Sequence, residues 1–148
     1  MPGLPRIGAT FRLAPSLQGV TWIGRGPHEN YPDRLASADF GCWHAALDEL
    51  HTPYIFPSDN GLRTDVTSLD LGEGKPLITG HFHFSISPYG QAQLTQAKHT
   101  YELQAQANVY VYLDGYHMGI GGDDSWSANV KPRYLLEEKH YRWQLRLQ

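Results

Sequence analysis

The chain has 148 residues, of which 41% are apolar and 18% are charged, and its net charge is −3. This composition is typical of one globular domain with its own core. The sequence contains no basic run that would form a face for nucleic acid, and no apolar run reaches the roughly 18 residues that a membrane span requires. Cys42 is the only cysteine, and the first residues lack the pattern of a secretory signal, so we expect a cytoplasmic protein.

Short strands joined by turns are the main predicted elements, because apolar and polar residues alternate in several runs. In chain order, strands are expected over 7–13, 20–23, 81–87, 101–113 and 141–148. The fourth run has an alternative reading as two strands with a turn near Asn108. Helices are expected over 36–50 and, for a turn or two, over 91–97.

The alternation predicts an all-β fold, an antiparallel β-sandwich in which each sheet has one buried face. We find no domain boundary, so residues 1–148 are expected to form a single domain. The apolar side of the runs predicts a core that includes Phe82, Phe84, Leu103, Val109, Val111, Trp143 and Leu145.

The segment 119–127 reads Gly-Ile-Gly-Gly-Asp-Asp-Ser-Trp-Ser. Glycine lets a backbone turn sharply or approach a ligand closely. A loop tryptophan offers a broad apolar face on which the C–H face of a sugar ring can stack. The pattern predicts a loop that presents Trp126 to carbohydrate. A core position for Trp126 is the alternative, but its Asp and Gly neighbours show no apolar periodicity.

Three blocks of the chain resemble the glycoside hydrolase family 2 β-galactosidases. They are Trp22–Arg34, Pro53–Arg63 and His117–Ser127, which come in that family's order and with similar spacing. One departure is Asp59, where the family usually has Glu. The resemblance covers nearly the whole chain.

The resemblance implies that the chain is about the C-terminal half of the family's last domain, a galactose-mutarotase-like β-supersandwich. The family's catalytic glutamates lie upstream in a TIM barrel, so no residue here is assigned as catalytic. Its Mg and Na ions are bound mainly by upstream domains, so no metal or other cofactor is expected in this chain. In the family, the tryptophan that matches Trp126 reaches the active site and stacks on the sugar.

Other polar residues are weaker candidates for a site. Asp123 and Asp124 are secondary candidates for substrate binding, but adjacent residues of an extended chain point to opposite faces, so loop hydrogen bonds are the favoured role. Glu29, Asp33 and Arg34 are expected to tie a proline-rich loop together through charge-assisted hydrogen bonds, with recognition of sugar hydroxyls as the alternative.

Histidines give two further possibilities. His81 and His83 share one strand face, but nothing nearby completes the three or four ligands of a zinc site, so we expect an outward polar face. Mutarotation needs a positioned acid and base, and His28 and Glu29 are too close in sequence to be assigned these roles.

The leading hypothesis is a C-terminal β-galactosidase segment that binds galactosides, completes the active-site rim and hydrolyses nothing alone. Its expected partners are a catalytic barrel domain or large subunit, and a second copy in a homo-oligomer. The alternatives are a separate carbohydrate-binding or mutarotase-like module, or a purely structural interaction segment.

Overall fold

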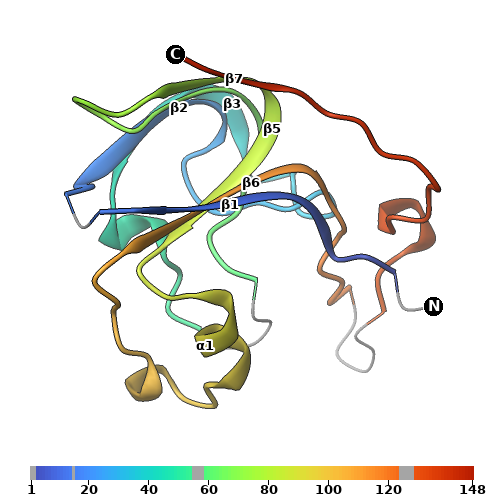
Figure 1. Cartoon of the computed structure of the whole chain (residues 1–148). Helices are drawn as coiled ribbons and strands as arrows, with labels where there is room; N and C mark the ends of the chain where they lie inside the picture. Colours follow the sequence, from blue (N-terminus) through green and yellow to red (C-terminus); the bar gives the residue numbers. More distant parts are fainter. Residues whose placement is uncertain (1–2, 15, 55–58, 124–128) are drawn as a thin grey trace.

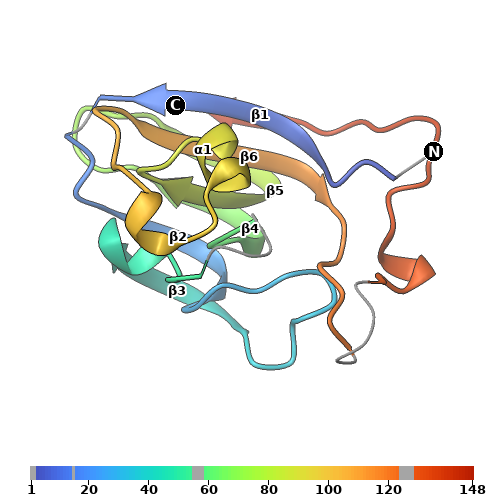
Figure 2. The same ribbon diagram turned by 90° about the horizontal axis from the view of Figure 1, so that it is seen from below.

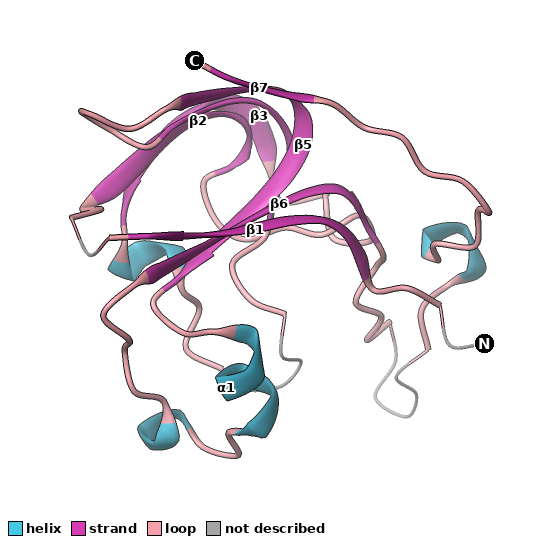
Figure 3. Cartoon of the chain, viewed as in Figure 1, coloured by secondary structure: helices cyan, strands magenta, loops and turns pink. Residues whose placement is uncertain are grey.

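A computed structural model describes residues 3–14, 16–54, 59–123 and 129–148. Strands dominate it, and the helical segments are short and peripheral (Figure 3). The strands are β1 (Arg6–Leu13), β2 (Gly19–Gly26), β3 (Asp39–Ala46), β4 (Arg63–Asp70), β5 (Leu77–Ser87), β6 (Val109–His117) and β7 (Leu145–Leu147). The helical segments are α1 (Gln91–Gln96) and the 3₁₀ turns Asp48–Leu50, Thr100–Glu102 and Pro132–Tyr134.

The strands form one antiparallel sheet in the order β1-β6-β5-β4-β2-β3, and β7 pairs with the first half of β5. The sheet curves strongly, so β1 and β6 cross beneath the end that carries β2, β3 and β7 (Figure 1). Seen from below, β1 and β3 lie at opposite ends of the sheet (Figure 2). The all-β, antiparallel prediction is confirmed, and this single curved sheet is consistent with part of a β-sandwich.

The core is built mainly from buried side chains of the central strands. Phe82, Phe84 and Ile86 alternate along β5 and are at most 1% exposed. Leu113 lies opposite Phe84 in the register between β5 and β6. The ring of Trp22 meets that of Phe84 edge-on, with 5.5 Å between the centroids. The predicted strands over 7–13, 20–23 and 81–87 and the short helix over 91–97 are confirmed.

The predicted helix over 36–50 is wrong. Residues Asp39–Ala46 form β3, which pairs with β2 along its whole length, with Trp22 opposite Trp43. Only Asp48–Leu50 turns, as a single 3₁₀ turn. Within Asp39–Ala46 only Ala45 and Ala46 are strong helix formers, so helix propensity does not outweigh a complete ladder of backbone hydrogen bonds to β2.

Two predicted strands are shorter than expected. The run over 101–113 becomes β6 only from Val109, because β5 ends at Ser87, opposite Tyr110, and offers no pairing partner to residues 101–108. The C-terminal run becomes a strand only over Leu145–Leu147. Of the predicted core, Phe82, Phe84, Val109 and Val111 are buried, whereas Leu103, Trp143 and Leu145 are only half-buried.

No helix in the described ranges combines the length and the apolar character that crossing a membrane would require.

Candidate functional site

The base of the glycine-rich loop is held by Asp33. Its carboxylate is 2% exposed and accepts hydrogen bonds from the backbone N–H groups of Ile120 at 3.1 Å and Gly121 at 2.8 Å. A Cβ on Gly119 would lie 2.5 Å from Asp33 Oδ2, so only glycine fits beside the carboxylate. Gly121 and Gly122 have φ angles of 72° and 77°, which other residues rarely adopt. These contacts join segments that are almost ninety residues apart in sequence.

Arg34 and Lys131 complete the attachment. Arg34 donates to the carbonyl oxygen of Gly121 and, at 3.1 Å, to Asp123 Oδ1. Lys131 Nζ lies 3.1 Å from the other carboxylate oxygen of Asp123. Gly119 N–H donates to the carbonyl oxygen of Tyr134 at 3.0 Å, which closes the loop at its base.

Asp123 is therefore engaged by two cations of its own chain. The hydrogen bond from Lys131, together with the positive charge of Arg34, lowers the pKa of the Asp123 carboxyl. Arg34 therefore makes charge-assisted hydrogen bonds, as expected, but to the glycine-rich loop rather than within the proline-rich loop. A role of Asp123 in substrate binding stays a prediction. Trp126 and Asp124 lie outside the described residues, so their predicted roles stay predictions.

Glu29 ties the second block to the first. One oxygen of its carboxylate accepts from Gly61 N–H at 2.8 Å, Tyr54 Oη at 2.9 Å and Tyr31 Oη at 3.3 Å. Burial, with the nearby Glu29 charge, raises the pKa of Tyr31, and burial also raises that of Tyr54. Both tyrosines consequently remain protonated hydrogen-bond donors. Three donors occupy the Glu29 oxygen, which matches the expected structural role.

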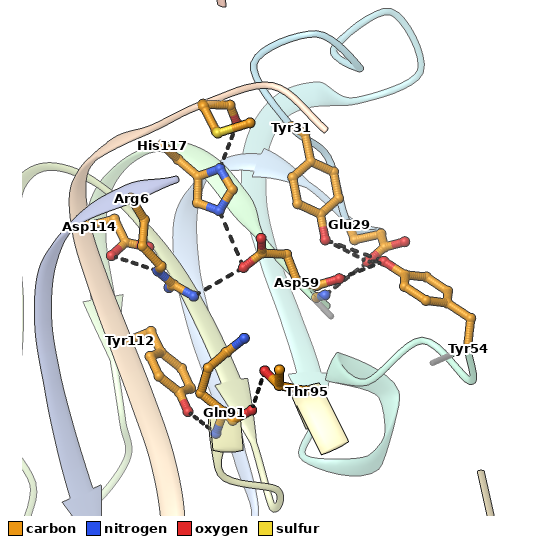
Figure 4. A network of polar contacts seen from close by, with 12 residues as sticks. Arg6, Glu29, Tyr31, Tyr54, Asp59, Gln91, Thr95, Tyr112, Asp114 and His117 are labelled. Carbon is orange, nitrogen blue, oxygen red and sulfur yellow. Dashed lines mark hydrogen bonds and ion pairs between the residues drawn. The ribbon is translucent and has the colours of Figure 1, made fainter. Parts of the chain in front are cut away.

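Asp59 joins the second block to the third (Figure 4). Its Oδ1 lies 3.4 Å from Arg6 Nη1 and 3.7 Å from His117 Nε2. Arg6 also donates from Nε to Asp114 at 3.2 Å. Burial alone would raise the pKa of Asp59, but the neighbouring His117 and Arg6 outweigh it and hold that pKa below its usual value.

His117 is fixed in orientation. Its side chain is 1% exposed, and Nδ1 lies 2.6 Å from the carbonyl oxygen of Met118, to which it donates. Nε2 has no hydrogen-bond partner in the described part of the chain, because the 3.7 Å to Asp59 exceeds hydrogen-bond length.

Sequence reasoning missed part of this network. It did not anticipate Arg6, Asp114, Tyr31 or Tyr54, although Tyr31 lies inside the first block and Tyr54 inside the second. A part-buried Arg–Asp pair that links two strands leaves no local pattern, because each residue looks like an ordinary polar position of an alternating strand.

Over the ranges the structure covers, no group of three or more His, Cys, Asp or Glu side chains is placed to hold a metal ion. The rings of His81 and His83 lie 6.5 Å apart, and His83 Nδ1 already accepts a hydrogen bond from Asp65 N–H at 3.1 Å.

Comparison with known proteins gives a consistent result. Residues 2–147 match the family described as the β-galactosidase small chain. A β-galactosidase of Vibrio cholerae serotype O1 is 55% identical over 147 residues, which is 99% of this chain and 14% of that protein. A β-galactosidase of Aeromonas hydrophila subsp. hydrophila is 53% identical over 97% of this chain and 14% of its own length. One of Klebsiella pneumoniae is 47% identical over 99% of this chain. The chain thus spans about 14% of the length of these relatives.

Proposed function

This chain belongs to the β-galactosidase small chain family, and we propose that it acts as the C-terminal segment of a β-galactosidase. In this proposal it supplies about half of a galactose-mutarotase-like domain, packs against a catalytic barrel or large subunit, and completes the rim of the active site. The reaction itself, hydrolysis of terminal β-galactosides, belongs to carboxylates of the partner. The proposal also includes a cytoplasmic location for the enzyme, and Mg and Na ions that are bound mainly by the upstream domains.

The observation that carries this proposal is the anchorage of the glycine-rich loop. The carboxylate of Asp33 and the two cations Arg34 and Lys131 all bind segment 119–123. Fixing a loop costs conformational entropy, about 1–2 kcal/mol per residue. A loop held this firmly at its base suits the presentation of a side chain such as Trp126 to a sugar in a partner's site, because positioning reduces the cost of binding.

The test is reconstitution of an enzyme. The β-galactosidase of Vibrio cholerae, shortened by the segment that matches this chain, is mixed with this chain and assayed with a chromogenic β-galactoside. We expect activity only in the mixture. Trp126→Ala should still form the complex, measured by light scattering, but should raise KM for substrates with bulky leaving groups. The matched control is Tyr101→Ala, which removes an aromatic side chain that is 79% exposed and lies outside the loop.

Two outcomes would contradict the proposal. Turnover by this chain alone, lost in Asp123→Asn or Asp124→Asn, would mean that the chain carries its own catalytic carboxylates. Restored activity that is indifferent to Trp126→Ala would mean that the chain assists the partner only by packing against it.

A further inference from the structure

A groove of ≈ 530 Å³ lies between the end of the sheet and the C-terminal segment, and it adjoins the base of the glycine-rich loop at Tyr134. Its size falls within the roughly 300–1,000 Å³ typical of small-molecule sites. The residues that matter for its chemistry are Asp65 of β4, His81 and His83 of β5, Tyr116 of β6, and Tyr134 and Trp143 from the segment that follows.

One wall of the groove is aromatic and held in place. A Cβ on Gly115 would lie 2.3 Å from Trp143 Cγ, so glycine allows the indole to lie against the backbone of β6. Tyr116 donates its hydroxyl to the carbonyl oxygen of Arg142 at 2.8 Å. Both Trp143 and Tyr116 are half-buried. The wall therefore offers apolar surface that needs little reorganisation to receive a ligand.

The floor offers a donor in a fixed tautomer. Because His83 Nδ1 accepts a hydrogen bond from Asp65 N–H, the proton of the neutral ring is on Nε2. Asp65 holds this position with a φ of 53°, unusual for a residue other than glycine. The structure gives His83 Nε2 no hydrogen bond within the described ranges, so its N–H is available to a ligand.

Charge decides between classes of ligand. The carboxylate of Asp65 is compensated by Arg25 Nε at 2.7 Å, and burial lowers the pKa of His83 to about 4, which keeps the ring neutral near pH 7. Asp65 and His83 thus present neither an uncompensated cation nor a free carboxylate to a ligand. Arg142 also lines the groove, but its side chain is exposed, so that solvent and salt screen its charge. A neutral ligand with one apolar face and several hydroxyl groups fits the wall and the floor together.

We infer that this groove is a separate sugar-binding site, which takes a neutral hexopyranoside with its C–H face against Trp143 and a hydroxyl on His83 Nε2. The site uses neither Trp126 nor a catalytic partner, so it does not depend on the function proposed above. A shallow site with one stacking face and few polar contacts should bind in the millimolar range, which corresponds to about −4 kcal/mol.

The experiment is a titration of the 148-residue chain with methyl β-D-galactopyranoside, followed by two-dimensional ¹H–¹⁵N NMR. We expect a saturable shift of the Trp143 indole N–H signal. His83→Ala should weaken binding about tenfold, the effect of losing one hydrogen bond worth about 1.4 kcal/mol. His83→Gln, which keeps an N–H donor at a similar reach, should retain more affinity. His140→Ala serves as control, since His140 is exposed and does not line the groove.

Trp126→Ala separates this site from the loop. Binding that survives Trp126→Ala and weakens in His83→Ala supports the groove. Binding that is lost in Trp126→Ala and unchanged in His83→Ala would place the sugar at the loop and overturn this inference while leaving the proposed function intact. No saturable shift at a concentration of about ten times the expected millimolar Kd would also overturn it.

Discussion

The carboxylate of Asp33 is the clearest case of one side chain that shapes a distant loop. It is almost completely buried, and a buried carboxylate is stable only where hydrogen bonds or cations compensate for its lost hydration. Two consecutive backbone N–H groups of the loop provide that compensation. The loop and the carboxylate therefore stabilise each other.

Asp33→Ala should release the loop base. The change leaves the N–H groups of Ile120 and Gly121 without acceptors, which should cost about 1–3 kcal/mol of unfolding free energy. Amide hydrogen exchange at these two residues is the direct measurement, and it should accelerate. Asp39→Ala is the matched control because Asp39 is exposed. Unchanged exchange at Ile120 and Gly121 would show that the loop is held by other contacts.

His83 gives the fold a dependence on acid. An unfolded histidine titrates near 6.5, whereas burial lowers the pKa of His83 to about 4. Between these values the ring is protonated in the unfolded chain but stays neutral in the folded chain. The contribution of His83 to the free energy of unfolding is therefore fully present above about pH 6.5 and is lost as the pH falls toward 4.

The pH series is measured as Tm in the wild type and in His83→Gln, which cannot titrate there. We expect the wild-type Tm to fall more steeply between pH 6.5 and 4. Acidic groups such as Asp59 also contribute to acid sensitivity, but they are common to both proteins. Parallel curves would mean that His83 takes up its proton as readily in the folded protein as in the unfolded chain.

At the scale of the element, β5 is the centre of the sheet. It pairs with β4, β6 and β7, and its apolar side chains lie in the middle of the core. β3 is an edge strand that pairs only with β2, and its Phe40 is 58% exposed. A phenylalanine in β5 is therefore expected to contribute much more to stability than a phenylalanine in β3.

Phe84→Ala should destabilise the protein by about 3–5 kcal/mol, because Phe84 is fully buried and its loss leaves a cavity beside Trp22. Phe40→Ala should change stability by less than about 0.5 kcal/mol, as is usual for surface positions. Urea denaturation of both variants measures this contrast. A cost below about 1 kcal/mol for Phe84→Ala would show that the core can collapse around the lost ring.

At the scale of the whole molecule, the sheet is open at both ends. β1 and β3 each lack a partner on one side within the described sheet, and they carry Phe11 and Phe40, which are 41% and 58% exposed. Unpaired edges with exposed apolar side chains favour pairing with another chain. In the proposed enzyme such surfaces suit contact with the rest of the protein.

We predict that the isolated chain self-associates, most simply as a dimer. Light scattering over a range of concentrations measures this. Phe11→Lys with Phe40→Lys should shift the equilibrium toward monomer, since lysine on an edge strand opposes pairing. Tyr101→Lys is the control, at an exposed site outside the strands. A strict monomer at high concentration would contradict the prediction.

Several features were readable from sequence because they depend on local pattern. The alternation through Phe82, Phe84 and Ile86 reports burial directly, since a strand exposes its two faces in turn. The three motif blocks likewise indicated the family, because long motifs that come in a fixed order can be recognised along the chain without knowing which residues are in contact. The all-β class and most strands follow from these signals.

What only the tertiary structure decided is which segments meet. Residues 101–108 have the pattern of a strand but no neighbouring strand to pair with, and Asp39–Ala46 became a strand because β2 lies alongside. Asp33 reaches Gly121, and Arg6 reaches Asp114, only because the order of strands in the sheet brings them together. Pattern along the chain encodes which face of an element is buried, whereas contacts between distant residues depend on how the elements pack, which no local pattern records.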